Sequence, residues 1–229
     1  MEDNMSLFEK IYYAADKDLK DTTLNELKKS GYDSVFLDLG CGDCKFTQKM
    51  TEVLNPRITI VADAIKARLN HAENLGYKII SVDLNQEIPL DSGSVDIIHA
   101  GDVIEHLNNT DMFIKEIKRL LSPDGCAYIS TPNLASWHNV ITLIMGKQPL
   151  TAMVSDEILS TGMNEDDINM PKHRRIFTFE GLKSLVEHHG LKVQDSWGCG
   201  YYPFFGIVSE YLSLADYRHA AYILMKVGK

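Results

Sequence analysis

The chain has 229 residues, of which 45% are hydrophobic and 24% are charged, and its formal net charge is −9. This composition is typical of a globular protein with a sizeable core. The negative charge argues against binding of nucleic acid over a broad basic face, and no stretch approaches the roughly 20 apolar residues that a membrane span needs. The N-terminus lacks the basic start and apolar core of a secretory signal. We therefore expect a cytoplasmic protein with one domain over residues 1–229.

Residues 5–29 carry apolar side chains at helical spacing, among them Leu7, Ile11 and Leu19, and Gly31 follows as a stop signal. The pattern predicts one or two amphipathic helices in an N-terminal segment over residues 1–30. Tyr12 lies in this segment. It is interpreted either as part of a lid over the site, where it would contact a substrate, or as an ordinary core residue.

Residues 35–44 predict a strand, a glycine turn and the start of a helix. β-forming residues lead to Asp38, then Gly40 and Gly42 follow, and a helical segment begins at about Lys45. Glycines at such a turn let the backbone approach a ligand closely, and the helix presents free N–H groups to it. The stretch is typical of a nucleotide-type cofactor site.

Cys41 and Cys44 in the same turn imitate half of a zinc or redox motif. A zinc site needs further Cys or His ligands at comparable spacing, and the sequence shows no second pair. The four cysteines of the chain are also too few and too unevenly spaced for a disulfide scaffold. We expect no metal at this pair.

Further strands are predicted at residues 58–62, 77–82, 95–100 and 126–130, and helices are predicted between them at 45–54, 64–75 and 112–121. Strands that alternate with helices predict an α/β fold, with a mostly parallel sheet and helices on both faces. Such sheets bind ligands beyond the carboxyl ends of their strands. Asp38, Asp63, Asp83 and Gly101 all fall at those ends, so we expect them to share one site.

The turn does not fit a dinucleotide. A dinucleotide site needs a third glycine three residues after Gly42, and Lys45 stands there. Asp63 follows the turn by about 20 residues, where a carboxylate can accept both ribose hydroxyls. A role as the cap of the next helix is compatible with the same position. The pattern thus favours a nucleoside cofactor without a pyrophosphate over NAD.

Four stretches, Leu37–Gly42, Gly101–Leu107, Arg119–Gly125 and Ser130–Asn133, resemble in order and spacing the motifs of class I S-adenosylmethionine-dependent methyltransferases. The resemblance implies a Rossmann-like, seven-stranded sheet whose last strand is antiparallel, which suits residues 221–226. One departure is Cys44, where the family often has a glycine.

The resemblance also implies the residues that bind S-adenosyl-L-methionine. Those near the glycine turn would hold the methionine part, those after the next two strands the ribose and the adenine, and a carbonyl after the fourth strand the methionine ammonium group. The predicted set is Asp38, Gly40, Cys41, Gly42, Asp63, Ala64, Asp83, Leu84 and Gly101.

His106 and His173 are the candidate catalytic residues. His106 is interpreted either as a general base or as a side chain that ties a helix end to neighbouring backbone. His173 opens a segment that resembles the His-x-Arg-x-Phe-Thr segment of methyltransferases for quinone precursors or glycans, and a plain surface loop is the alternative. Arg175 is predicted to bind an anionic substrate or to form a surface ion pair. Trp137 is a further substrate-binding candidate.

Asp102, Glu105 and His106 have the spacing of a divalent-cation site that the resemblance to ubiquinone-type O-methyltransferases implies. Glutamate followed by histidine is also common at this place in methyltransferases that use no metal. We predict no metal and keep these three residues as the alternative.

The predicted function is transfer of a methyl group from S-adenosylmethionine to a small molecule, a quinone precursor or a glycan, at an oxygen atom. Residues 134–176 and 198–218 are predicted to lie over the active site and shape the acceptor pocket. Two alternatives stay open: a catalytically inactive S-adenosylmethionine-binding regulatory protein and, less favoured, an NAD(P)-dependent reductase.

Overall fold

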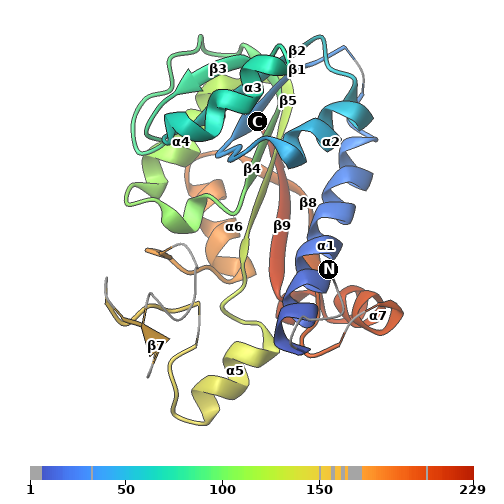
Figure 1. Cartoon of the computed structure of the whole chain (residues 1–229), viewed down its shortest axis with the longest axis vertical. Helices are drawn as coiled ribbons and strands as arrows, with labels where there is room; N and C mark the ends of the chain where they lie inside the picture. The colour runs from blue at the N-terminus through green and yellow to red at the C-terminus, as the bar shows by residue number, and fades with distance from the viewer. Residues whose placement is uncertain are drawn as a thin grey trace.

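The structure is a computed structural model that describes residues 7–31, 33–149, 151–155, 158–160, 163–164, 172–204 and 206–229. Its centre is a seven-stranded sheet in the order β3-β2-β1-β4-β5-β9-β8 (Figure 1). The strands are β1 (Val35–Leu39), β2 (Ile58–Asp63), β3 (Lys78–Ser81), β4 (Val95–Gly101), β5 (Leu121–Pro132), β8 (Lys192–Cys199) and β9 (Tyr222–Gly228).

Strands β1 to β5 pair in parallel, whereas β9 runs antiparallel to both of its neighbours, β5 and β8. The predicted fold class, including the antiparallel last strand, is confirmed. The strand order reverses between β1 and β4, because the chain first builds outward to β3 and then returns to the other side of β1. Ligands of open α/β sheets bind at such a point, beyond the carboxyl ends of the strands.

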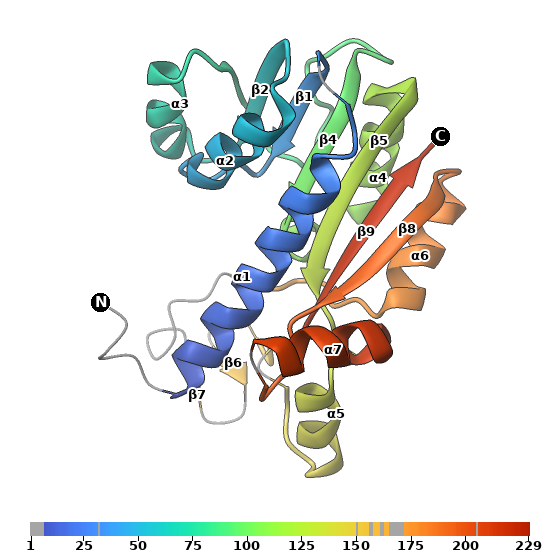
Figure 2. The ribbon, with the colours of Figure 1, turned by 90° about the vertical axis from the view of Figure 1, so that its right-hand side faces the viewer.

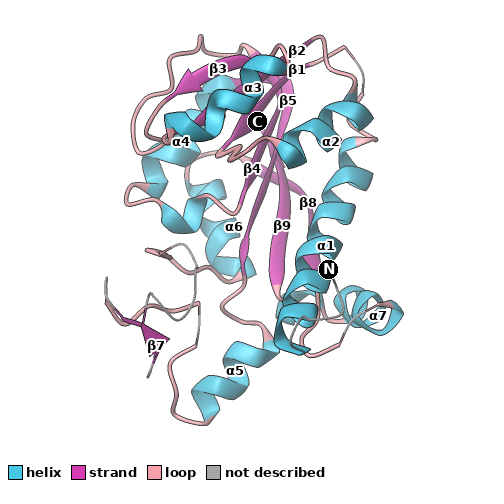
Figure 3. Ribbon diagram, in the orientation of Figure 1, coloured by secondary structure: helices cyan, strands magenta, loops and turns pink. Residues whose placement is uncertain are grey.

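Helices, cyan in Figure 3, cover both faces of this sheet (Figure 2). They are α1 (Leu7–Leu27), α2 (Lys45–Leu54), α3 (Asn70–Asn74), α4 (Thr110–Leu120), α5 (Trp137–Ile144), α6 (Phe179–His188) and α7 (Ile207–Ala215), with 3₁₀ turns at Lys66–Leu69, Ile104–His106 and Tyr217–His219. None of the helices in the described part of the chain is long and apolar enough to cross a membrane.

Side chains that point alternately to the two faces of the sheet create the two halves of the core. Phe36 in β1 packs with α1 and α2 on one face, whereas its neighbour Leu37 packs with the other face, where Phe113 of α4 and Leu182 of α6 are buried. Successive side chains of a strand point to opposite faces, so the continuous apolar run of a parallel strand supplies both cores. The sheet is therefore buried on both sides, and its strand ends remain for the site.

Some predicted elements differ from the structure. Within the segment 5–29, Leu7–Leu27 form the one helix α1, and the helix expected over residues 64–75 is instead a 3₁₀ turn followed by the short helix α3. His106 lies in a 3₁₀ turn, whereas a helix was expected. Strand β5 begins five residues earlier than expected, because Leu121 already pairs with Val95 across a bulge.

The predicted embellishment at 134–176 contains α5 and a small sheet of β6 (Ile158–Ser160) and β7 (Met163–Asn164). Residues 165–171 of this segment lie outside the described residues. The second predicted embellishment, 198–218, holds α7 and most of the following 3₁₀ turn.

Candidate active site

The glycine turn between β1 and α2 is shaped by two glycines with different surroundings. Gly40 has φ +75°, its N–H donates to the Ala62 carbonyl at 2.7 Å, and an added Cβ would stand 2.3 Å from Cγ2 of Val103. Gly42 has φ +56°, and no neighbouring atom lies within 4 Å of the place where its Cβ would be. Gly40 thus allows the turn to pack against the loop after β4, and Gly42 leaves open space for a ligand.

Asp63, at the end of β2, lies against this turn. Its Oδ2 accepts a hydrogen bond from the Gly42 N–H at 3.1 Å, and its Oδ1 accepts one from the Ile65 N–H at 2.8 Å. The Arg68 guanidinium is 3.9 Å away. The predicted juxtaposition of Asp63 with the glycine turn is therefore present, and backbone donors fix the orientation of the carboxylate.

The Asp38 carboxylate is buried and both of its oxygens are engaged. Oδ1 accepts from Nδ1 of His99 at 2.8 Å, and Oδ2 accepts from the Thr47 hydroxyl at 2.5 Å. Because the carboxylate fixes Nδ1 as the protonated nitrogen, Nε2 of His99 is the nitrogen that a ligand can reach. An added Cβ on Gly101 would stand 2.9 Å from this Nε2.

These side chains line a cavity of about 150 Å³, and one wall of it comes from α1, which runs beside β1, β4 and β5 (Figure 2). Lys20 and Asp16 of α1 form an ion pair at 2.7 Å on this wall. The cavity thus presents both signs of charge. The lining residues are Asp16, Leu19, Lys20, Thr23, Asp38, Gly40, Cys41, Phe46, His99, Gly101, Asp102 and Ser130.

Sequence reasoning missed His99, Asp16 and Lys20. A histidine inside the apolar strand β4 was a visible signal, because a buried imidazole needs a partner and Asp38 lies on the neighbouring strand. No comparable signal marked Asp16 and Lys20, which read as ordinary exposed positions of an amphipathic helix. Their place depends on where α1 docks.

Asp83 and Leu84 follow β3 at the same edge of the sheet. Oδ1 of Asp83 accepts from the N–H and the amide of Asn85 at 2.9 and 2.8 Å, and Oδ1 of Asn85 accepts from the N–H groups of Asn108 and Asn109. This network links the loop after β3 to the loop after β4. Leu84 is buried, and Ala64, the remaining cofactor candidate, is exposed beyond β2.

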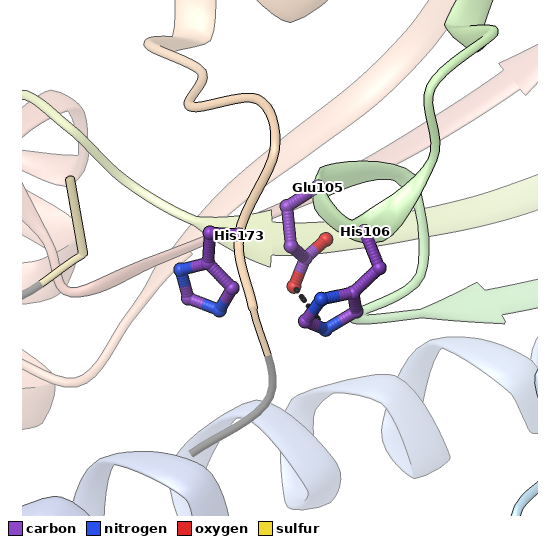
Figure 4. Close-up of side chains that lie close together, drawn as sticks. All are labelled: Glu105, His106 and His173. Atoms are coloured by element: carbon purple, nitrogen blue, oxygen red, sulfur yellow. Dashed lines mark ion pairs between the residues drawn. The ribbon is translucent and has the colours of Figure 1, made fainter. Parts of the chain in front are cut away.

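A second cluster is formed by Glu105, His106 and His173 (Figure 4). Glu105 and His106 belong to the 3₁₀ turn after β4, and His173 comes from the segment that precedes α6. The N–H groups of Arg174 and Arg175 donate to the Glu105 carbonyl at 2.7 and 3.0 Å. These two bonds bring the distant segment to the turn, so the structure places the two predicted histidines side by side, with ring centroids 5.1 Å apart.

Each histidine of the cluster donates from Nδ1 to a backbone carbonyl. Nδ1 of His106 lies 2.7 Å from the Lys172 oxygen, and Nδ1 of His173 lies 3.3 Å from the Thr151 oxygen. Burial lowers the pKa of both imidazoles, and the other histidine adds to this effect for His173. Both rings are therefore neutral near pH 7, with a lone pair on Nε2.

Glu105 is 1% exposed. Its Oε2 accepts from the Thr131 hydroxyl at 3.0 Å, while Oε1 has no hydrogen-bond partner among the described residues. Burial, together with the charge of Asp102, raises the pKa of this carboxyl well above its usual range. Burial also raises the pKa of Asp102 to about 6, and the hydrogen bond from Ser130 opposes that rise.

The alternative metal set of Asp102, Glu105 and His106 is not the group that the structure assembles. Asp102 bonds Ser130 through Oδ1, and its place in the cluster is taken by His173. The motif spacing indicated two of the three residues. The third could not be read from it, because His173 arrives through long-range backbone bonds.

The predicted substrate-binding residues lie apart from one another. Nε1 of Trp137 donates to Asp216 at 2.9 Å, and its ring stacks on His219 with centroids 4.6 Å apart. Arg175 is exposed and donates to the Asn108 carbonyl at 3.3 Å. Tyr12 is 45% exposed, and burial of its hydroxyl raises its pKa. Arg175 touches the histidine cluster through its backbone N–H, which donates to the Glu105 carbonyl, and not through the hydrogen bonds of its side chain.

A family model described as methyltransferase domain matches residues 11–196. The chain belongs to this methyltransferase family. Both the glycine turn and the loop after β4 lie inside the matched range, and the cavity lies at the carboxyl ends of the strands, where open α/β sheets bind ligands. The cofactor of this S-adenosylmethionine-dependent family and the enzyme class are as predicted from the sequence.

Named relatives agree with the family. The methyltransferase is 25% identical over 206 residues to the mitochondrial ubiquinone biosynthesis O-methyltransferase of Rattus norvegicus, covering 86% of this chain and 55% of the relative. It is 32% identical over 118 residues to the ubiquinone biosynthesis O-methyltransferase of Glaesserella parasuis, covering 48% and 50%. The chain thus spans about half the length of these relatives.

Solved structures share the fold at low sequence identity. An S-adenosylmethionine-dependent methyltransferase from Mesorhizobium loti superimposes with a TM-score of 0.65 at 14% identity, over 94% of this chain and 100% of that one. A second, from Clostridium acetobutylicum, gives a TM-score of 0.60 at 14% identity, over 93% and 91%. These likenesses establish the fold of the methyltransferase and nothing finer.

Proposed function

We propose that this methyltransferase transfers the methyl group of S-adenosylmethionine to an oxygen atom of a small-molecule acceptor. The observation that carries the proposal is the cluster of the buried Glu105 with the partly exposed His106 and His173. It supplies neutral imidazole Nε2 atoms just beyond Asp102, a residue that lines the cofactor cavity. A hydroxyl is a poor nucleophile until its proton is removed, and such a cluster suits that task.

The cofactor would lie along the glycine turn. We propose that the backbone of Gly40, Cys41 and Gly42 borders the methionine part and that Asp63, with Ala64, holds the ribose. Asp83 and Leu84 would border the adenine. These assignments follow the order in which the strand ends succeed one another along the sheet, from β1 to β2 to β3.

The charged end of the methionine would meet the cavity wall. We propose that the Gly101 carbonyl and Nε2 of His99 accept from the ammonium group and that Lys20 binds the carboxylate, because all three residues line the cavity. Asp38 would act through His99 and Thr47, because both of its oxygens are already engaged by them. This differs from the direct contact that the sequence suggested for Asp38.

Methyl transfer is an in-line displacement. The acceptor oxygen forms a bond to the methyl carbon, the bond from that carbon to sulfur breaks, and its electron pair stays on sulfur. The hydroxyl proton passes to Nε2 of His106 or His173. Alignment of the three atoms and exclusion of water supply a large part of the rate, and the base contributes roughly 10²- to 10⁴-fold.

We propose a quinone precursor with a phenolic hydroxyl as the acceptor class. The support is the name of the relatives, ubiquinone biosynthesis O-methyltransferase, and the need of a phenol for a neutral base near pH 7. Arg175, Tyr12 and Trp137 remain candidates for the outer part of the acceptor pocket. The glycan acceptor and the cytoplasmic location expected from the sequence stay predictions.

The test is an acceptor panel. Purified protein with S-adenosylmethionine and a set of catechols, other phenols and glycans should yield S-adenosylhomocysteine and an O-methylated phenol, detected by mass spectrometry. Binding of S-adenosylmethionine without turnover on any acceptor would instead support the regulatory alternative. Tight binding of NAD(P)H without binding of S-adenosylmethionine would support the reductase.

A further inference from the structure

We propose that Tyr12, Tyr202 and Tyr222 form the subsite that holds the body of the methyl acceptor, and that this subsite takes an uncharged aromatic molecule in preference to one that carries a carboxylate. The inference rests on the function proposed above, because only a methyl-transferring protein needs an acceptor. The three tyrosines come from separate elements, which are α1, the segment after β8 and the start of β9.

The cofactor cavity continues toward these tyrosines along one face of α1. Asp16 and Lys20 line the cavity, and Tyr12 precedes Asp16 by four residues. Residues four apart in a helix lie one turn apart on the same face, so Tyr12 extends the lining by one turn beyond Asp16. The charges of Asp16 and Lys20 act on the Tyr12 hydroxyl, as this placement requires.

The strands continue the cavity in the same direction. Ser130 of β5 lines the cavity, and Tyr222 of β9 pairs with Pro132, which lies two residues further along β5. Side chains two residues apart in a strand share a face, so Tyr222 is on the face of Ser130, which α1 covers. The Tyr222 hydroxyl interacts with those of Tyr12 and Tyr202, so the three hydroxyl groups gather beside the cavity.

The segment that carries Tyr202 is fixed against α1. The Gly200 N–H donates to the Asp18 carboxylate at 2.7 Å. Gly200 has φ +68°, and an added Cβ there would stand 2.4 Å from Cβ of Ala15. The close approach of helix and segment holds the tyrosines in place before a ligand arrives, which lowers the cost of binding one.

A buried polar atom beside the tyrosines still lacks a partner. The ring of His138, in α5, meets the ring of Tyr202 edge to face with centroids 4.6 Å apart. Nδ1 of His138 is buried and has no hydrogen-bond partner among the described residues. Such an atom is destabilising until it is paired, and a polar group of a bound acceptor would pair it.

The charges around the subsite disfavour an anion. The charge of Asp102 acts on all three tyrosines, and burial already raises the pKa of Asp102 to about 6. A second negative charge beside it would be less favourable still. His138 offers no compensation, because burial lowers its pKa to about 4 and its ring is neutral near pH 7. Lys20 is already paired with Asp16 at 2.7 Å.

Asp102 is also a neighbour of the histidine cluster, since its charge raises the pKa of Glu105. An acceptor ring held by the tyrosines would therefore direct its reacting hydroxyl toward Nε2 of His106 or His173. Burial raises the pKa of each tyrosine hydroxyl. The tyrosines consequently stay protonated and hydrogen-bond the acceptor, and they leave removal of its proton to the histidines.

The experiment measures acceptor binding to the full chain with S-adenosylhomocysteine bound, so that no turnover is needed. The probes are catechol and protocatechuate, which share one ring and differ by a carboxylate. We expect catechol to bind at least about tenfold more tightly than protocatechuate in calorimetry, because the carboxylate would lie near the buried acid. Equal or tighter binding of protocatechuate would overturn the inference and favour Arg175 as an anchor for an anionic acceptor.

Variants of the tyrosines test which residues hold the ring. Tyr12→Phe, Tyr202→Phe and Tyr222→Phe each remove one hydroxyl and keep the aromatic ring, and each should weaken catechol binding about five- to tenfold. Their affinity for S-adenosylmethionine should stay within about twofold, which verifies that they are folded. Tyr13→Phe is the matched control, because Tyr13 follows Tyr12 on α1 and is 53% exposed. Catechol affinity that is unchanged in all three variants would overturn the subsite.

The outcomes separate this inference from the proposed function. Methylation of phenols, together with catechol binding that is indifferent to the three tyrosine variants, would leave the proposed function standing and remove the subsite. Selective catechol binding that depends on the tyrosines, without methylation of any phenol, would keep the binding site and leave the proposed function without support.

Discussion

The two sides of the site differ in how their polar groups are satisfied. On the methyl-donor side, the carboxylates of Asp38 and Asp63 have a hydrogen bond on each oxygen. On the other side, Glu105 keeps one buried oxygen without a partner among the described residues, and a ring nitrogen of His106 and one of His173 lie within 4.8 Å of a Glu105 carboxylate oxygen. The donor side is therefore organised before a ligand arrives, whereas the histidine cluster has bonds still to make.

This difference predicts which side of the site controls cofactor affinity and which side controls turnover. Preorganised donors and acceptors cost little rearrangement on binding, so the donor side should set the affinity for S-adenosylmethionine. The histidine cluster should set turnover with little effect on that affinity. Substitutions on the two sides are then expected to affect different measured quantities.

The largest effect is expected for His173→Ala. It removes one of the two neutral Nε2 atoms of the cluster, and we expect kcat on a phenolic acceptor to fall about 1,000-fold. The dissociation constant for S-adenosylmethionine, measured by calorimetry, should stay within about twofold. A variant that keeps full turnover would remove His173 from the chemistry.

Asp63→Ala should produce the opposite pattern. The substitution deletes the acceptor of the Gly42 and Ile65 N–H groups together with the proposed ribose contact. Loss of about 3 kcal/mol of charge-assisted hydrogen bonding corresponds to roughly 100-fold weaker binding of S-adenosylmethionine. Arg68→Ala, which removes only a neighbour 3.9 Å away, is the matched control and should change affinity little. Unchanged affinity in Asp63→Ala would make the ribose assignment wrong.

The same contrast explains how much the sequence could predict. The donor side is built from residues that follow successive strands, so the order of strands and the position of Asp38, Asp63 and Asp83 sufficed to place them at one edge. The family, the sheet and the cofactor class are confirmed. Which atom each side chain bonds was not predictable, and Asp38 turned out to be enclosed by His99 and Thr47.

The other side depends on contacts between segments distant along the chain. Sequence patterns flagged His106 and His173 separately but gave no reason for their rings to lie 5.1 Å apart, because that distance is set by backbone bonds from Arg174 and Arg175 to Glu105. The role of α1 was hidden in the same way. Its face toward the cavity follows from tertiary packing, which the helical spacing of apolar residues does not specify.

A smaller effect on the donor side is expected for Lys20→Met. The side chain keeps its apolar stem but loses the charge that lines the cavity, and the half-exposed ion pair with Asp16 is screened by solvent. We expect S-adenosylmethionine to bind about five- to tenfold more weakly, with a smaller loss at high salt. Lys17→Met is the matched control on the same helix, because Lys17 is exposed and pairs with Asp21. Equal effects of the two variants would contradict a role for Lys20 in the cavity.

The smallest effect is expected for a substitution of Asp102, which lies between the two sides of the site. Its pKa of about 6 in the folded protein lies above the ordinary 3.8, so folding opposes its ionisation. The free energy of unfolding is therefore unaffected by Asp102 below pH 3.8, where the carboxyl is protonated, and it decreases as the pH rises toward 6.

Asn in its place keeps an oxygen for the Ser130 hydroxyl, tolerates the φ of +51°, and carries no charge to bury. Asp102→Asn should therefore be more stable than the parent by about 1 to 2 kcal/mol at pH 7, or about 3 to 6 °C in Tm, with the advantage shrinking to nothing near pH 4. Thermal unfolding at several pH values measures this. A stability advantage that does not depend on pH would show that the buried charge is not its cause. Asp102 would then not belong to the side of the site whose polar groups lack partners.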